Sequence, residues 1–182
     1  MIRLARRDEH DLVHRMMLDG FAPTRAFDLP SSALSETRAD LDRAVAGGAA
    51  LLAFCAGRPV ASARLAPSWS SRPAFDVAFA FERAAGGGRV PGSPGGALHV
   101  SRMSVLPAMW NRGIGAALLA WIEGFAGRLG LDAVELNVRS QQPDNRPYYQ
   151  RQGYRITGYS ERYGIADMST HMRKELQGDP SS

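Results

Sequence analysis

The stretch V-L-P-A-M-W-N-R-G-I-G-A-A-L-L-A-W-I-E-G-F-A-G-R-L-G, from Val105 to Gly130, decides the expected architecture. An apolar strand is expected to end at Val105, and a helix to begin near Arg112. Gly130 is expected to end the helix, because glycine is favoured just beyond a helix C-terminus. The apolar residues of this helix recur every three or four positions, as on one buried face. They are Ile114, Leu118, Trp121, Ile122, Phe125 and Leu129.

Two glycines, Gly113 and Gly115, lie in the first turn of this helix. Each costs about 1 kcal/mol of helix stability relative to alanine, so a compensating role is expected. The N–H groups of a first turn have no partner within the helix and form the positive end of its dipole. Where Cβ atoms are missing, an anion can approach these groups closely. The turn is therefore predicted to bind a phosphate.

Two common phosphate-binding motifs fit this turn poorly. The kinase-type loop G-x-x-x-x-G-K-[ST] requires a lysine, and none follows here. The dinucleotide fingerprint needs a third glycine or alanine and an adjacent strand. Here Leu118 holds that position, and seven residues separate Val105 from Gly113. A helix that begins with small residues for close packing is the remaining alternative, so the interpretation depends on the rest of the chain.

The stretch resembles the central motif of the GNAT superfamily of N-acetyltransferases, V-x-P-x(n)-[QR]-x-x-G-x-[GA]. In that family the turn holds the pyrophosphate of acetyl-coenzyme A (acetyl-CoA). Trp110 stands where the pattern usually has Gln or Arg, although backbone amides make most of the phosphate contacts in such a turn. The resemblance implies that the cofactor-binding turn consists of Arg112, Gly113, Ile114, Gly115 and Ala116.

A second stretch, P-D-N-R-P-Y-Y-Q-R-Q-G-Y from Pro143 to Tyr154, resembles the other GNAT signature, N-x-x-[FY]-Y-x-x-x-G-[FY]. The resemblance implies that Tyr149 is the catalytic acid and that Asn145 belongs to the cofactor site. Tyr148 is expected to pack. The two motifs occur in the family's order around a strand, which makes the joint signal stronger than either motif alone.

The strands on either side of the glycine helix, Ala97–Val105 and Leu131–Val138, complete a β-α-β crossover and should therefore be parallel. Strict alternation would place four residues of the first strand on one face. They are His99, Ser101, Met103 and Val105. The resemblance further implies that the two strands splay apart, so that the backbone of Met103 and Val105 can bind the pantetheine arm.

The implied fold is α/β (α+β), with a central mixed, mostly antiparallel sheet whose parallel pair is splayed around the CoA site. A single GNAT-like domain is expected over residues 1–176, followed by a disordered tail over 177–182. A strand is also expected over Phe75–Phe81, where aromatic residues alternate with small or charged ones. The Gly/Pro-rich run after it is expected to form a loop. Phe21, Phe27 and Leu29 could line an acceptor wall or simply pack in the core.

Amide formation from a thioester poses two proton problems. Deprotonating a lysine-like amine at pH 7 costs about 4–5 kcal/mol, whereas a tyrosine protonates a thiolate at a cost of only about 2 kcal/mol. A base should therefore matter more than an acid. His99, with an ordinary pKa of about 6.5, could act through a water, or could be a hydrogen-bonded strand histidine. Asp76, Glu82 and Glu135 are rival bases.

Composition sets the remaining expectations. The N-terminal stretch becomes charged at once and the sequence has one cysteine, Cys55, so a reducing, cytoplasmic location is expected. His10 and His14 are spaced as metal ligands could be, but no third ligand is evident, and no metal is expected.

The net charge of +4 suits an anionic ligand. No long basic run indicates nucleic acid, and no apolar run of about 18 residues indicates a membrane span.

The sequence therefore predicts an N-acyltransferase that moves an acetyl group from acetyl-CoA to a primary amine. The amine would belong to a small molecule or a peptide and would attack directly, without a covalent enzyme intermediate. The alternative is a CoA-binding regulatory or sensory domain with weak catalysis. A homodimer is left open.

Overall fold

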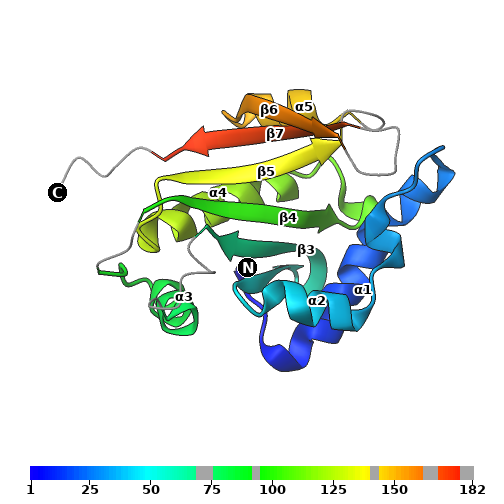
Figure 1. The fold of residues 1–182 in the computed structure, drawn as a ribbon. Coiled ribbons are helices and arrows are strands. Elements are labelled where there is room, and N and C mark those ends of the chain that lie inside the picture. Colours follow the sequence, from blue (N-terminus) through cyan, green and yellow to red (C-terminus); the bar gives the residue numbers. More distant parts are fainter. Residues whose placement is uncertain (69–75, 92–94, 140–143, 162–167, 177–182) are drawn as a thin grey trace.

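The computed structural model describes residues 1–68, 76–91, 95–139, 144–161 and 168–176. Within them, seven strands form one sheet in the order β1-β2-β3-β4-β5-β7-β6 (Figure 1). The strands are β1 (Ile2–Leu4), β2 (Ala49–Cys55), β3 (Arg58–Pro67), β4 (Ala97–Val105), β5 (Ala133–Arg139), β6 (Arg155–Glu161) and β7 (Met168–Glu175). β4 and β5 pair in parallel, and the other described pairs are antiparallel. The predicted mixed sheet with one parallel pair is confirmed.

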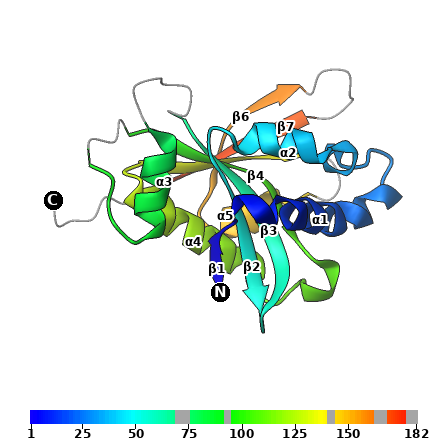
Figure 2. The ribbon, with the colours of Figure 1, turned by 90° about the horizontal axis from the view of Figure 1, so that it is seen from below.

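Helices cover both faces of the sheet (Figure 2). One face carries α1 (His10–Phe21) and α2 (Arg38–Val45), and the other carries α3 (Val77–Ala85), α4 (Ile114–Arg128) and α5 (Arg146–Arg151). Short 3₁₀ turns complete the described elements: η1 (Arg7–Glu9), η2 (Ala22–Ala26), η3 (Ser32–Ser35) and η4 (Pro107–Met109). The tail over 177–182 lies outside the described residues.

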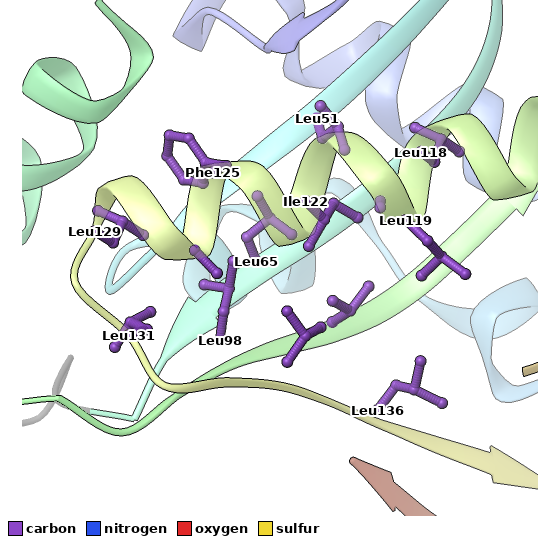
Figure 3. Packing of buried hydrophobic residues seen from close by; sticks show 14 of the residues in the cluster. Leu51, Leu65, Leu98, Leu118, Leu119, Ile122, Phe125, Leu129, Leu131 and Leu136 are labelled. Atoms are coloured by element: carbon purple, nitrogen blue, oxygen red, sulfur yellow. The ribbon is translucent and has the colours of Figure 1, made fainter. Parts of the chain in front are cut away.

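Each face of the sheet has its own hydrophobic core, because successive strand residues point to opposite faces. On β2, Leu51 packs into the larger core beneath α4, whereas Leu52 packs into the smaller core beneath α1 and α2. Leu118, Ile122 and Phe125 of α4 are fully buried in the larger core (Figure 3). This packing fixes α4 across the sheet, so that its first turn follows closely on the end of β4.

The strand expected over Phe75–Phe81 is wrong where it can be compared, because Val77–Ala85 forms the helix α3. The Oδ1 atom of Asp76 accepts a hydrogen bond from the Phe79 N–H at 2.9 Å and caps the helix. The run V-A-F-A-F alternates in size but is apolar throughout, so its period does not distinguish strand from helix. Phe75 lies outside the described residues.

β4 contains a β-bulge that alternation alone does not reveal. Ser62 of β3 pairs with Ser104 and Arg64 pairs with Ser101, so that Arg102 and Met103 together lie opposite one residue of β3. Arg102 has a φ of +50°, in a region that non-glycine residues rarely occupy. The bulge shifts every later side chain of the strand by one position.

The predicted common face of His99, Ser101, Met103 and Val105 is therefore wrong. The neighbours of His99 on β4 belong to the larger core, which places His99 and Ser101 on the α1 face. Beyond the bulge, Met103 and Val105 pack against the larger core instead. The hydroxyl of Ser104, between them, donates to the Met16 carbonyl of α1 at 3.3 Å. The bulge thus gives the two halves of β4 opposite orientations.

Candidate active site

The parallel strands β4 and β5 separate part-way along their length. Their pairing runs from Ala97 with Ala133 to Val100 with Leu136, and beyond it the strands diverge towards their C-terminal ends (Figure 1). The Leu106 N–H bonds across to the Val60 carbonyl of β3 at 2.9 Å. Because successive residues direct their backbone groups to opposite edges of a strand, those of Val105 face the β5 side. The predicted splay is present.

A cavity of about 310 Å³ lies at this separation, and sixteen of the described residues line it. It brings together four of the predicted site residues, His99 and Met103 from β4 with Asn145 and Tyr149 from the α5 region. Val105 and the glycine turn over 112–116 are not part of its lining. The predicted residues therefore divide between a cavity in the sheet and a turn at the start of α4.

The side chain of Trp110 forms a hydrogen bond with the end of β4. Its indole N–H donates to the Val105 carbonyl at 2.8 Å, and the side chain is 49% exposed. The residue that replaces the family's Gln or Arg therefore already occupies one backbone group at the splayed end of the strand. Pantetheine binding by Val105 remains a prediction that involves chiefly its N–H group.

The first turn of α4 has the geometry that a phosphate needs. Gly113 is the N-cap with a φ of +74°, and a Cβ built there would meet no atom within 4 Å. The Ala117 N–H makes the first bond within the helix, to the Gly113 carbonyl at 3.0 Å. The preceding N–H groups therefore have no intrahelical acceptor and point out of the turn. This open turn fits the pyrophosphate of acetyl-CoA.

Gly115 also lies close to Tyr148, and its predicted place in the cofactor turn stays a prediction. A Cβ built at this position would lie 2.6 Å from the Tyr148 hydroxyl oxygen, so a larger residue here would require the tyrosine to shift. That hydroxyl is buried and has no hydrogen-bond partner among the described residues. Tyr148 packs edge-on against Tyr149, with the ring centroids 5.1 Å apart. Packing of Tyr148, as predicted, thus gives a further reason for a glycine at position 115.

Tyr149 is placed and protonated as a proton donor would be. It lines the cavity, and its ring lies against those of Tyr148 and Tyr154. Burial raises the pKa of Tyr149 well above its usual value of 10, and the neighbouring Tyr148 adds to the effect. The phenol therefore keeps its proton throughout the physiological range.

His99 also lines the cavity, from the face of β4 that carries α1. Burial lowers the pKa of His99, the Glu135 carboxylate partly opposes this, and His171 lowers it further. The imidazole is therefore neutral near pH 7 and can accept a proton. Glu135 lies beside His99 in the register and is paired with Arg173, Nη1 to Oε1, at 2.6 Å.

The other two rival bases lie elsewhere. Asp76 caps α3, and Glu82 is exposed on the same helix. Neither lines the cavity. The described site thus leaves His99 and, next to it, Glu135 as the groups near enough to the cavity to accept a proton.

Arg102 and Ser32, which line the cavity, belong to a charged cluster that sequence analysis missed. Arg102 donates from Nε to Glu36 Oε1 at 2.6 Å and from Nη2 to the Ser32 hydroxyl at 3.2 Å. The other oxygen of Glu36 pairs with Arg64, whose Nη2 also lies 3.2 Å from the Met17 sulfur. One carboxylate therefore serves two guanidiniums. The available signal was an arginine in the interior of each of two predicted strands.

A second arginine, Arg139, also lines the cavity. It lies at the end of β5 and donates from Nη1 to the Leu29 carbonyl at 2.7 Å. Of the three residues suggested for an acceptor wall, Phe21 lines the cavity, whereas Phe27 and Leu29 do not. The 3₁₀ turns that follow α1 thus reach the cavity through other residues as well, among them Thr24 and Ser32.

The part of the chain that the structure describes contains no group of three or more His, Cys, Asp or Glu side chains placed to hold a metal ion. Nor does it contain a helix long and apolar enough to cross a membrane. His10 instead pairs with Asp42 at 2.7 Å, and His14 bonds to the Glu36 carbonyl at 2.8 Å.

A mixed sheet with one splayed parallel pair, an open glycine turn after the first of these strands and a tyrosine beside the gap define an acetyltransferase fold. The model of the Acetyltransferase (GNAT) family matches residues 15–154, and the chain belongs to that family. The resemblance predicted from the two motifs is confirmed.

Known proteins agree with this assignment. An aminoalkylphosphonate N-acetyltransferase from Salmonella typhimurium is 36% identical over 57 residues, which span 31% of this chain and 37% of that protein. A GNAT-family structure from Desulfovibrio desulfuricans has a TM-score of 0.66 at 17% identity and covers 97% of this chain and 99% of its own. A Salmonella typhimurium structure solved with acetyl-CoA has a TM-score of 0.61 at 18% identity and covers 100% and 96%. These structures show the shared fold.

Proposed function

We propose that this acetyltransferase moves an acetyl group from acetyl-CoA to a primary amine of a small molecule or peptide, by direct attack of the amine. The observation that carries the proposal is the cavity between β4 and β5, which both Tyr149 and His99 line beside the splayed strands. The name of the curated relative, an N-acetyltransferase, supports an amine acceptor.

Two regions would bind acetyl-CoA, the first turn of α4 and the splayed part of β4. The N–H groups at the start of α4 would hold the pyrophosphate, with Gly113 leaving the approach open. The β5-facing backbone groups of β4, around Met103 and Val105, would bond to the amide-rich arm of the cofactor. Asn145, which lines the cavity ahead of α5, would contact the same arm. Acetyl-CoA would supply the acetyl group as a thioester.

The cavity residues would handle the two protons. His99, neutral near pH 7, would accept the proton of the incoming amine through a water. Tyr149 would donate its proton to the departing thiolate, since burial keeps the phenol protonated. Neither residue forms a bond to the acetyl group. The nitrogen gains the acetyl group and loses a proton, and the sulfur leaves as the thiol.

The proposal is tested by calorimetric titration with acetyl-CoA, followed by measurement of thiol release over a panel of primary amines. Binding with thiol release that depends on the amine is expected. Absence of binding at high micromolar acetyl-CoA would contradict the proposal. Binding without transfer to any amine would leave the CoA-binding regulatory domain as the better account.

A variant separates the phosphate turn from the fold. Gly113→Asn introduces a side chain of a residue type that tolerates positive φ, as Asn111 does nearby with a φ of +58°. Its side chain would occupy the open space in front of the turn. Acetyl-CoA affinity should fall about tenfold or more, with little change in melting temperature. Unchanged affinity in the folded variant would remove the phosphate role of the turn.

A further inference from the structure

Three polar side chains form a row across the neighbouring strands β4, β5 and β7. In the register, His99 of β4 pairs with Glu135 of β5, and Glu135 pairs with Arg173 of β7. The chain neighbours of both His99 and Glu135 belong to the larger core, which puts these two side chains on the other face. Because neighbouring strands lie about 4.8 Å apart, paired side chains on one face lie next to each other.

Arg173 fixes the Glu135 carboxylate within this row. Its Nη1 atom donates to Glu135 Oε1 at 2.6 Å, and its Nε atom donates to Glu175 Oε1 at 2.6 Å. The Glu135 carboxylate is therefore bonded on its β7 side, while its β4 side adjoins His99 in the register.

The row leads from the cavity to solvent. Of its three residues, only His99 lines the cavity. The Glu135 side chain is 40% exposed and so remains in contact with water outside the cavity. Glu135 can thus influence a reaction in the cavity only through His99.

Burial and the carboxylate affect His99 in opposite directions. Burial lowers the pKa of the imidazole because it disfavours the charged ring, the Glu135 carboxylate raises it, and His171 lowers it further. A base whose pKa falls far below the working pH is a weak proton acceptor. The carboxylate therefore preserves the basicity of a histidine that burial weakens.

We propose that Glu135 is a positioning residue for the proton acceptor. Its carboxylate stabilises the imidazolium that forms when His99 takes a proton, and Arg173 both holds this carboxylate and weakens its field. This role rests on the proposed function, in which His99 accepts the proton of the amine through a water. The proton leaves the ammonium nitrogen, binds an imidazole nitrogen and is lost to solvent after the transfer.

Other charged or titratable groups lie on the elements around His99. They are Glu36, Arg64 and Arg102 on the α1 side, Arg139 and Tyr149 at the cavity, and Arg155, His171 and Glu175 beyond β5. None of these occupies a register position directly beside His99, where β3 presents Ala66 and β5 presents Glu135. Changes at Glu135 and Arg173 therefore address the carboxylate next to His99 and its partner.

The test is an NMR titration of the protein with isotope-labelled histidine, in which His99→Gln assigns the His99 signal. In Glu135→Gln the imidazolium loses its stabilising charge, so the His99 midpoint should move to lower pH. In Arg173→Gln the carboxylate loses its counter-charge, so the midpoint should move to higher pH. Opposite shifts are not expected from a loss of packing. An unmoved midpoint in either folded variant, or shifts in the same direction, would overturn the proposal.

Two further variants serve as controls. Arg173→Lys retains the positive charge and should keep the His99 midpoint close to that of the wild type. Glu175→Gln removes the other carboxylate bound to Arg173, which pairs in the register with Ala133 and not with a residue of the row, and should also leave the midpoint nearly unchanged. A shift in Glu175→Gln as large as that in Glu135→Gln would contradict a specific role for Glu135.

The pH profile of kcat/KM provides the catalytic readout. The rate requires neutral His99 and falls as pH drops through its pKa, so the acid limb of Glu135→Gln should lie at lower pH than that of the wild type. Its plateau should fall about threefold, because the base is weaker but present, whereas His99→Gln should lose about 10²-fold. The affinity for acetyl-CoA should not change, since Glu135 lies outside the cavity lining.

The titration does not depend on turnover, which separates this role from the proposed function. Opposite midpoint shifts in a protein that acetylates no amine would contradict the transferase and leave the influence of Glu135 on His99 in place. Efficient acetyl transfer with an unmoved acid limb in Glu135→Gln would leave the transferase in place and contradict the role of Glu135.

Discussion

The cofactor side and the acceptor side of the proposed active site are built by different means. On the proposed cofactor side, the candidate recognition elements lie in one continuous segment, from the end of β4 through Trp110 and Gly113 into α4. These elements are backbone groups and a glycine conformation. On the acceptor side, side chains from distant segments meet, as Ser32 and Glu36 meet Arg102.

This difference shows why one side can be recognised from a motif and the other cannot. A turn that presents N–H groups is specified by a few adjacent residues, since glycine at positive φ determines its shape. A charged cluster depends on which segments the fold brings together. The two sides should therefore respond differently to mutation: the acceptor side through side-chain charge, and the cofactor side through local space.

The largest effect is expected from removing the charge shared by the acceptor-side arginines. Glu36→Gln leaves Arg64 and Arg102 without their common carboxylate, and the Glu36 side chain is only 15% exposed. The free energy of unfolding should fall by about 3 kcal/mol, as for breaking a buried pair. Chemical denaturation measures the change.

A matched control removes an exposed carboxylate. Glu175→Gln breaks its pair with Arg173, where the Glu175 side chain is 69% exposed, and should cost no more than about 1 kcal/mol. Similar losses in the two variants would contradict a buried, structurally important cluster on the acceptor side.

The next effect concerns the tyrosine between the two sides. Tyr149→Phe keeps the ring but removes the proton donor, so turnover should fall about 10²-fold while acetyl-CoA affinity stays unchanged. Because burial raises the pKa of Tyr149, the wild-type acid stays protonated as pH rises, and the deficit should persist to pH 10. Steady-state rates across pH measure it.

Tyr148→Phe is the control for this variant, since it deletes the same atom from the adjacent ring. It should turn over at nearly the wild-type rate. If both variants lose rate equally, or if Tyr149→Phe loses none, the assignment of Tyr149 as the acid fails.

A smaller effect tests the local space on the cofactor side. Gly115→Ala would place a Cβ 2.6 Å from the Tyr148 hydroxyl and should cost about 1 kcal/mol of stability. Adding Tyr148→Phe removes the oxygen and should recover that loss, which gives a coupling energy of about 1 kcal/mol. Gly127→Ala, in the same helix with no atom within 4 Å of the new Cβ, should stabilise instead. Additive changes at 115 and 148 would disprove the contact.

The smallest effect lies away from the cavity, at the start of α1. Hydrogen bonds from Arg3 chiefly, and from the Arg6 N–H, lower the pKa of Glu9 from 4.5 to about 2. A carboxyl group whose pKa is lower in the folded state stabilises the fold at pH values above its unfolded-state pKa. This contribution is lost as the pH falls through its folded-state pKa. The difference in melting temperature between wild type and Glu9→Gln should therefore shrink between pH 4.5 and about 2. A constant difference over that range would contradict the pairing.

Much of the fold could be predicted from local patterns, because the periods of helices and strands depend on residues that are close in the sequence. The β4–α4–β5 crossover was predicted from the spacing of Leu118, Ile122 and Phe125 and from the flanking apolar runs. α3 was mistaken for a strand because alanines between its large side chains conceal the helical period.

The rest could not be predicted, for two physical reasons. The bulge at Arg102 adds one residue to a regular alternation and leaves no mark in polarity, yet it moves Met103 to the other face. The Arg64–Glu36–Arg102 cluster depends on the packing of η3 and the following turn against β3 and β4. His99, by contrast, precedes the bulge and lines the cavity, and its role as a base stays a prediction.

Direct transfer of an acetyl group to an amine at the β4–β5 separation is tested most directly by a single turnover with acetyl-CoA labelled in the acetyl group. The reaction is quenched and separated into protein and small molecules. We expect no label on the protein in the absence of an amine, and full transfer of the label to the amine when one is present. Label bound covalently to the protein and then passed to the amine would contradict direct attack.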